Sequence, residues 1–202
     1  MRRASWLLGL WSRRIRVTFP HAGPTESHTV AGYGERLMTR GALEIRPFHE
    51  DDLDAIVDFS LRAWRPVFAS LRRVLGDEIF LRLHPDWRTD QAEAVRSSCT
   101  SDARDVFVAV VNARPVGFAA VALNAFHQRM GVIDIIGVDP DYQRQGVASR
   151  LTDAAIDHMQ SRGMDIAVVE TGGDPGHEPA RAFYEAGAFT LLPIARYFRL
   201  IG

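Results

Sequence analysis

Three side chains in the C-terminal half of the chain have the chemistry needed for proton transfer: Tyr184, Asp134 and Glu170. A free phenol has a pKa of about 10, so Tyr184 is protonated at neutral pH and can donate to a leaving group. Asp134 interrupts the apolar run 132–138, and a carboxylate buried there must either pair with a donor or take up a proton. Glu170 follows the apolar run 166–169, at a strand end where the ligand sites of α/β folds gather. Either carboxylate could act as a general base toward an ammonium substrate.

Each of these residues also has a structural interpretation. Tyr184 would then pack and only hydrogen-bond a ligand. Asp134 would lie on a solvated strand face or cap a neighbouring loop, and Glu170 would be a charge at a strand end that faces water. In a functional role, Glu170 could also anchor the amine of a substrate instead of acting as the base. The residue types alone leave these alternatives open.

A second candidate site is the loop that joins the run 132–138 to the next helix. Asp139-Pro140-Asp141 ends the strand, because proline fixes φ and the residue before it avoids the α region. Apolar residues then recur with helical spacing from Val147 onward. A helix N-terminus has unpaired N–H groups and a partial positive charge, and Gly146 lets the backbone approach a ligand. The pattern predicts a phosphate-binding loop.

The spacing of Gln143, Gly146 and Ala148, between a predicted strand and a predicted helix, resembles motif A of the GNAT superfamily of N-acetyltransferases. Residues 177–189 resemble the family's motif B, with Ala180, Phe183, Tyr184 and Phe189 at the expected positions. Two departures are visible: His177 stands where the family often has Asn, and Gly187 comes one position early. The resemblance covers about residues 43–201, and two motifs in the right order are more specific than either alone.

The resemblance implies an α/β domain with the GNAT (acyl-CoA N-acyltransferase) fold, a mixed sheet of six or seven strands and helices on both faces. The strands at 132–138 and 166–170 should splay apart, so that the cleft between them admits the pantetheine arm of acetyl-CoA. The residues expected to bind the coenzyme are Ile136, Val138, Gln143, Arg144, Gln145, Gly146, Val147, Ala148, Ser149 and His177. Arg144 and Arg150 would add charge for the phosphates or lie in solvent.

The implied reaction is direct transfer of acetyl from acetyl-CoA, a co-substrate, to a primary amine of a small molecule or peptide. Glu170 or Asp134, through water, would remove the amine proton, and Tyr184 would assist the departing thiol. The resemblance requires no metal, and the sequence contains no Gly-x-Ser-x-Gly nucleophile motif. Two alternatives remain: a non-catalytic acetyl-CoA sensor, and a partner-binding protein of the same fold.

The elements that must position these residues follow from the apolar pattern. It predicts strands at 43–46, 106–111, 116–123, 132–138 and 166–169, with closing strands at 191–192 and 195–201. It predicts helices from 51, at 68–83 with a break near Gly76, at 87–99, at 147–162 and from Pro179. Trp64, Phe68, Phe80 and Trp87 would form either an aromatic wall for the substrate or part of the core.

Composition and charge limit the remaining possibilities. The chain has 202 residues, 47% of them hydrophobic, which is enough for one domain with a real core. All 24 basic residues are arginine, and Cys99 is the only cysteine, so no intrachain disulfide can form. Residues 41–202 hold 17 Arg and 23 acidic residues, a net charge of −6, which is no nucleic-acid signature. A cytoplasmic protein, with a homodimer as an open possibility, is expected.

Residues 1–40 differ from the rest, with seven Arg and two acidic residues and a net charge of +5. Their apolar stretch is far shorter than the roughly 20 residues of a membrane span. We expect a disordered or misassigned extension, with Met38 as an alternative start, ahead of a domain at 41–202.

Overall fold

The computed structural model describes residues 42–201, so the predicted extension at 1–40 lies outside the described residues. The strands are β1 (Glu44–Pro47), β2 (Asp105–Val111), β3 (Arg114–Leu123), β4 (Met130–Val138) and β5 (Ile166–Val169). The helices are α1 (Leu53–Leu83), α2 (Trp87–Thr100), α3 (Val147–Ser161) and α4 (Glu178–Ala186). Three short 3-10 turns complete the order: η1 (Glu50–Asp52), η2 (Pro140–Tyr142) and η3 (Pro175–His177).

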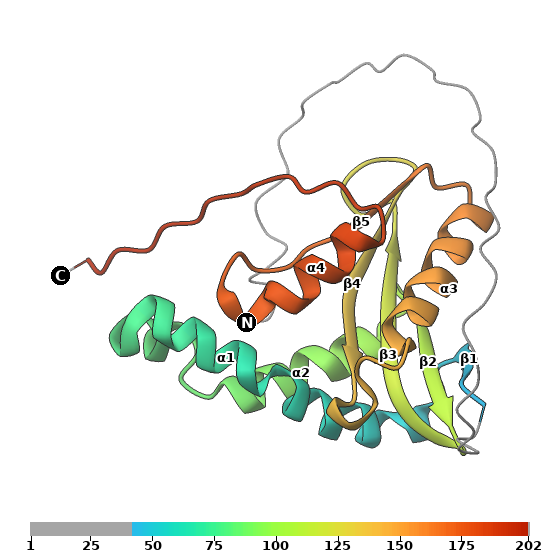
Figure 1. The fold of residues 1–202 in the computed structure, drawn as a ribbon, viewed down its shortest axis with the longest axis horizontal. Coiled ribbons are helices and arrows are strands. Elements are labelled where there is room, and N and C mark those ends of the chain that lie inside the picture. Colours follow the sequence, from blue (N-terminus) through green and yellow to red (C-terminus); the bar gives the residue numbers. More distant parts are fainter. Residues whose placement is uncertain (1–41, 202) are drawn as a thin grey trace, which may run out of the picture.

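The five strands form one mixed sheet in the order β1-β2-β3-β4-β5 (Figure 1). The first four strands are antiparallel neighbours. Short connections let β3 and β4 each turn back on the strand before, whereas η1, α1 and α2 lie between β1 and β2. β5 runs parallel to β4, and α3 forms the crossover between them. The sheet and its crossover confirm the predicted α/β class.

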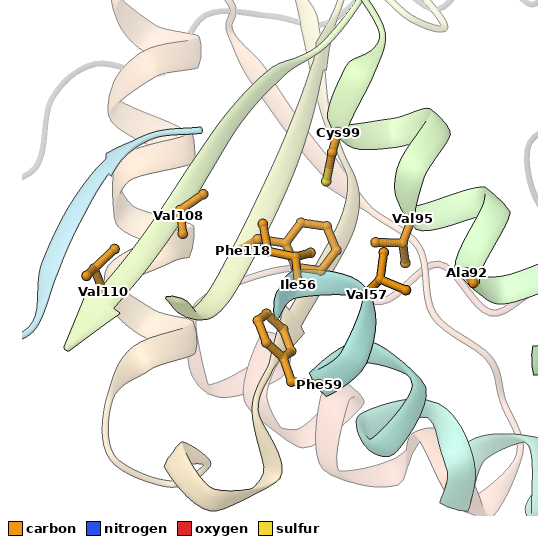
Figure 2. Close-up of a cluster of buried hydrophobic side chains, with 9 residues drawn as sticks. All are labelled: Ile56, Val57, Phe59, Ala92, Val95, Cys99, Val108, Val110 and Phe118. Atoms are coloured by element: carbon orange, nitrogen blue, oxygen red, sulfur yellow. The ribbon is translucent and has the colours of Figure 1, made fainter. Parts of the chain in front are cut away.

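Helices cover both faces of the sheet, as expected. On one face, α1 and α2 bury an apolar cluster against β2 and β3 (Figure 2), made of Ile56, Val57, Phe59, Ala92, Val95, Cys99, Val108, Val110 and Phe118. On the other face, α3 packs Val147, Leu151, Ala155 and Met159 against the sheet. Burying each large side chain stabilises the fold by about 1.5–3 kcal/mol relative to exposing it.

One helix corrects the predicted boundaries. We expected a helix from residue 51 and a separate one at 68–83, but α1 (Leu53–Leu83) continues through Pro66 and is interrupted at Gly76 instead. Phe59 and Phe68 are buried on either side of that proline, so packing holds the helix together where local propensity would end it. The predicted break near Gly76 is present, because this glycine has a φ of 75° and a ψ of 159° inside the helix.

The predicted closing strands are wrong. Residues 190–201, which we call the C-terminal arm, form neither strand nor helix and run away from the sheet (Figure 1). The arm has the apolar composition of a strand, but its main chain does not pair with β5, and Tyr197 is 91% exposed. The sheet of the described residues therefore has five strands instead of six or seven. None of the helices within residues 42–201 combines the length and apolarity that crossing a membrane requires.

Candidate active site

The parallel strands β4 and β5 stop pairing half-way along β4. Their pairing runs from Met130 with Ile166 to Ile133 with Val169, while β4 continues to Val138. The register between β3 and β4 shifts at the same place, which leaves Asp134 as an extra residue in β4. Such a bulge bends a strand and ends regular pairing. The predicted splay of these strands is thus present, and the end of β4 has no β5 residue beside it.

The main chain of Ile136 and Val138 faces this opening. Asp139 donates its N–H to the carbonyl of Val116 on β3, at 2.9 Å. In an antiparallel ladder successive residues turn their N–H and C=O groups to opposite sides. The groups of Val138 and Ile136 therefore point away from β3, toward the space that β5 leaves open. These are the polar groups a pantetheine amide would need.

The loop after β4 ends at the N-terminus of α3. Arg144 and Gly146 both have left-handed backbone, with φ of 58° and 81°. The first intrahelical bond joins Arg150 N to Gly146 O at 3.1 Å, so the N–H groups of Val147, Ala148 and Ser149 have no acceptor within the helix. The first turn of α3 carries no acidic residue. This terminus therefore suits a diphosphate.

The loop leaves room for such a group. A Cβ built on Gly146 would meet no atom within 4 Å. Gln143 and Gln145 hold the loop in shape, since their side-chain amides donate to the carbonyls of Val138 at 3.3 Å and of Asp141 at 2.9 Å. The structure thus brings residues 143–149 together at the edge where β4 is unpaired.

A buried carboxylate anchors this loop, and sequence reasoning missed it. Asp139 is 0% exposed and accepts from the guanidinium groups of Arg62 at 3.0 Å and Arg114 at 3.1 Å. Arg62 comes from α1 and also reaches Asp141, at 3.3 Å. The sequence pattern predicts only a strand break at Asp139. The signal available was an acid that directly ends an apolar run and precedes proline.

Tyr184 lies on α4, where its side chain packs edge-on against Phe189 with ring centroids 5.6 Å apart. The residue is 9% exposed, and burial raises its pKa to about 12. Its hydroxyl has no hydrogen bond to any residue between 42 and 201 that would compete for its proton. The side chain is therefore a neutral donor at physiological pH.

The sequence model of the acetyltransferase (GNAT) family matches residues 69–188, more than half of the chain. The chain belongs to this family. The match spans the unpaired part of β4, the loop, α3, β5 and α4, which are the elements that carry the geometry described above.

Two relatives of this GNAT chain carry names that refer to different acceptors. It is 36% identical over 97 residues to N-alpha-acetyltransferase 30 of Schizosaccharomyces pombe, covering 46% of this chain and 59% of the relative. It is 40% identical over 65 residues to mycothiol acetyltransferase of Beutenbergia cavernae, covering 32% of this chain and 20% of the relative. The matches therefore span less than two thirds of either relative's length.

A solved structure supports the fold. An aminoglycoside N-acetyltransferase in complex with CoA superimposes with a TM-score of 0.57, covering 81% of this chain and 99% of that chain. The two sequences are 18% identical, so this likeness establishes the GNAT fold and no more.

The two candidate bases of the GNAT chain have different surroundings. Asp134, in the bulge of β4, has a side chain that is 7% exposed and is paired with the guanidinium of Arg104. Glu170 is exposed and follows Val169, the last β5 residue paired with β4. Among residues 42–201 no ion pair engages Glu170. Within the described part of the chain, Glu170 is thus the unpaired carboxylate of the two, and it lies where β4 and β5 separate.

His177 is fixed at the start of α4 by partners that the sequence did not reveal. Its Nδ1 pairs with Asp174, whose side chain is 6% exposed, and Ser70 of α1 hydrogen-bonds the same loop. Burial alone would raise the pKa of Asp174, but hydrogen bonds from Ser70 and His177 outweigh it and leave that pKa below its ordinary value. Arg181 donates to the carbonyls of Gly172 at 2.6 Å and Asp174 at 2.8 Å.

The four aromatic residues of the first two helices divide between the two interpretations. Phe68 and Phe80 are buried, and Phe68 stacks on Trp87 with centroids 4.5 Å apart, which favours core packing for these three. Trp64 instead covers Gly137 of β4, where an added Cβ would lie 2.8 Å from its ring. Trp64 is therefore the aromatic residue that borders the unpaired part of β4.

Proposed function

We propose that this protein transfers acetyl from acetyl-CoA to a primary amine of a small molecule or peptide by direct attack. The observation that carries the proposal is the end of β4–β5 pairing at Ile133 and Val169, beside a loop shaped for a diphosphate. One edge of the sheet then offers main-chain partners for the pantetheine arm and N–H groups for the phosphates. Acetyl-CoA supplies the activated acetyl group when it is bound there.

The residues around this edge would have separate roles in binding the coenzyme and in transferring protons. The main chain of Ile136 and Val138 would bind the pantetheine amides, and residues 143–149 would bind the diphosphate. Tyr184 would give its proton to the departing sulfur, which its raised pKa permits because the phenol stays protonated. Glu170 would hold the acceptor ammonium or accept its proton. The Arg104 pairing makes Asp134 the weaker candidate for either role.

Direct attack, without an acetylated enzyme, agrees with the environment of the sole cysteine. Cys99 is buried between α2 and the sheet, and burial raises its pKa to about 12. The thiolate that a covalent route would need is therefore scarce at neutral pH. Cys99 belongs to the core instead.

The acceptor is proposed from charge and from the relatives. Residues 41–202 carry a net charge of −6, and Glu170 is exposed near the split, which suits a cationic amine. The similar proteins are named as an N-alpha-acetyltransferase, a mycothiol acetyltransferase and an aminoglycoside N-acetyltransferase. A peptide N-terminus and an amino sugar are the two acceptor classes to examine first.

The test is thiol release from acetyl-CoA by the full-length protein, with peptides, aminoglycosides, polyamines and amino acids as acceptors. We expect release with one class and none without acceptor, and mass spectrometry should find the acetyl group on an amine. Thermal stabilisation by acetyl-CoA without release for any amine would favour the sensor alternative. Stabilisation by a protein partner but not by acetyl-CoA would favour the partner-binding alternative.

The remaining expectations about partners and location need separate measurements. Light scattering of the purified protein would test the homodimer, and titration with DNA and with lipid vesicles would test the expected lack of binding to either. Cell fractionation would test the cytoplasmic location.

A further inference from the structure

A chain of hydrogen bonds links α1 to the start of α4 through Ser70, Asp174 and His177. The Ser70 hydroxyl accepts from the N–H of Gly176 at 2.9 Å and donates to the Asp174 carboxylate. Asp174 pairs in turn with Nδ1 of His177. Ser70 is buried, whereas the His177 side chain is 21% exposed, so only the far end of this chain reaches solvent.

This arrangement selects one imidazole tautomer. Asp174 is ionised at neutral pH, since hydrogen bonds from Ser70 and His177 more than offset its burial. A carboxylate only accepts, so Nδ1 of His177 carries the hydrogen. In the neutral ring Nε2 then has the free lone pair. A carboxylate that holds Nδ1–H also stabilises the imidazolium that forms when Nε2 takes a proton.

Helix α1 connects the loop that holds His177 to the part of β4 that β5 leaves unpaired. His177 is the N-cap of α4, and Tyr184 follows seven residues later on the same helical face, about 10 Å along the axis. The loop that contains His177 packs against α1 (Figure 1). On α1, Ser70 holds this loop and Trp64 covers Gly137 of β4. Helix α1 thus contacts both the loop that holds His177 and the unpaired part of β4.

The charges around His177 are of both signs. Asp174 lies against Nδ1, and Arg181 of α4 binds the neighbouring carbonyls of Gly172 and Asp174. The contact from α1 is Ser70, which does not titrate near neutrality. Ser70 lies on the Asp174 side of the imidazole, away from Nε2, so this trio is not arranged to activate a serine nucleophile.

We infer that Nε2 of His177 is the group that accepts the proton of the acceptor ammonium. The inference rests on the proposed function and deepens it, because it leaves Glu170 to hold the cationic amine. His177 takes one proton from the nitrogen, and the freed lone pair forms the new N–C bond as the C–S bond breaks. Tyr184 gives its proton to the sulfur, the second nitrogen proton restores the phenol, and His177 releases its proton to water.

The decisive variant is His177→Asn, because it installs the residue often found at this position in the family and so preserves a coenzyme-binding role. For thiol release we expect kcat about 10²-fold lower, with the KM for acetyl-CoA within about threefold of wild type. The acidic limb of kcat/KM should move to higher pH, because without the base only amine that is already unprotonated can attack. The deficit should shrink as pH rises, because more of the amine is already unprotonated.

Three further variants separate the possible roles. Asp174→Asn should lower kcat and shift the acidic limb, because it removes the partner that fixes the tautomer. Glu170→Gln should raise the KM for the amine and keep the acidic limb. His158→Asn is the matched control: it removes another His–Asp pair, with Asp105 at 2.7 Å between α3 and β2, and should leave the profile unchanged. Melting curves and CoA binding by calorimetry check that each variant folds.

The outcomes distinguish this inference from the proposed function. If His177→Asn keeps kcat and the acidic limb, or raises only the KM for acetyl-CoA, His177 binds coenzyme and the inference is wrong. If Glu170→Gln alone moves the acidic limb to higher pH, Glu170 is the base and the inference is again wrong. If the wild-type protein releases no thiol with any amine, or releases it equally without amine, the proposed function is wrong, and the inference, which rests on it, is wrong as well.

Discussion

Burial sets the protonation state of Tyr184 where the sequence could only suggest its role. Spacing within the motif predicted the residue, but a motif does not tell how much of a side chain is exposed. An apolar environment disfavours the charged phenolate, and the pKa rises to about 12. The side chain therefore keeps its proton over the whole range in which an amine is a competent nucleophile.

Replacing Tyr184 by Phe should remove the acid and keep the packing. We expect kcat for thiol release to fall about 10²-fold, with the KM for acetyl-CoA nearly unchanged, because only the proton donor is lost. Steady-state kinetics with the acceptor found in the screen would measure both constants. Turnover equal to that of wild type would show that Tyr184 is not the acid.

The raised pKa of Tyr184 also makes a prediction about alkaline pH. A phenol that ionised near its ordinary pKa of about 10 would lose its proton, and kcat would fall from about pH 9 upward. With the pKa at about 12, wild-type kcat should instead stay level up to about pH 10. A spectrophotometric titration of phenolate absorbance, compared between wild type and Tyr184→Phe, would locate the transition directly.

For single residues, the sequence predicted which side chains matter better than it predicted the partners that those side chains contact. It identified Asp134 as an unusual carboxylate, but the pairing with Arg104, 30 positions away, depends on the fold. It also left the role of His177 open, because the contact with Ser70 joins segments 106 positions apart. Contacts of this kind depend on how helices dock, which periodicity does not encode.

Among the elements, the entry into α3 depends on backbone conformation. Gly146→Ala should lower the free energy of unfolding by about 1 kcal/mol, since a left-handed φ strains any residue with a Cβ. It should also weaken binding of CoA, because the methyl group enters the space over the free N–H groups. Gly163→Ala is the matched control, with a φ of 77° and equally open space at the other end of α3.

Denaturant unfolding and calorimetry would measure the two effects of this glycine pair. Both variants should lose similar stability, while only Gly146→Ala should lose affinity for CoA. Equal affinity in the two variants would show that the loop does not approach the coenzyme closely.

The start of α1 depends on a buried ion pair with β1. Asp52 accepts two hydrogen bonds from Arg46, both 2.7 Å, and one from the N–H of His49 at 2.9 Å. The Arg46 bond holds the pKa of Asp52 below its usual value, and the His49 bond adds to it despite burial. Asp52→Asn should therefore cost about 1–3 kcal/mol of stability at pH 7.

The sign of the pH dependence follows from that lowered pKa. The contribution of Asp52 is present above its unfolded pKa of about 3.9 and is lost as the pH falls through the lower folded value. The stability difference between wild type and Asp52→Asn should therefore narrow below about pH 4. Urea titrations at pH 7 and pH 3 would measure it, and a constant difference would assign the effect to packing.

Element boundaries could be predicted wherever the pattern was local. The hairpin of β2 and β3 and the helix α3 follow directly from alternation and helical spacing. The continuity of α1 through Pro66 and the unpaired C-terminal arm could not be predicted, because each depends on whether a distant partner is present. Helices satisfy their own backbone groups, whereas a strand needs a neighbour.

In the whole molecule, the C-terminal arm and the edge of β5 that is unpaired within residues 42–201 both favour association between copies of the chain. Leu191, Leu192, Ile194 and Ile201 are each more than half exposed, and exposed apolar stretches and open strand edges favour association. We expect the full-length chain to associate as its concentration rises. A chain ending at Thr190 should associate less and unfold at a similar denaturant concentration, because the arm contributes little packing.

Light scattering over a concentration series would compare the two chains, with matched urea unfolding. A truncated chain that is much less stable would show that the arm packs on its own sheet in solution. If the truncated chain associates as strongly as the full chain, the surface responsible for association lies outside the C-terminal arm. Trypsin offers a second measurement, since Arg196 and Arg199 in the arm should be cut before any site in the sheet.

The divergence of β4 from β5 has a consequence for how the protein can evolve. The groups that face the opening at Ile136 and Val138 belong to the main chain, which every amino acid except proline supplies in full. Codon changes there alter volume but delete no donor or acceptor. Side chains of α1 and the loop before α4 remain free to vary around the acceptor. Recognition of acetyl-CoA would thus be inherited almost unchanged, while the preference for the amine substrate changes during evolution.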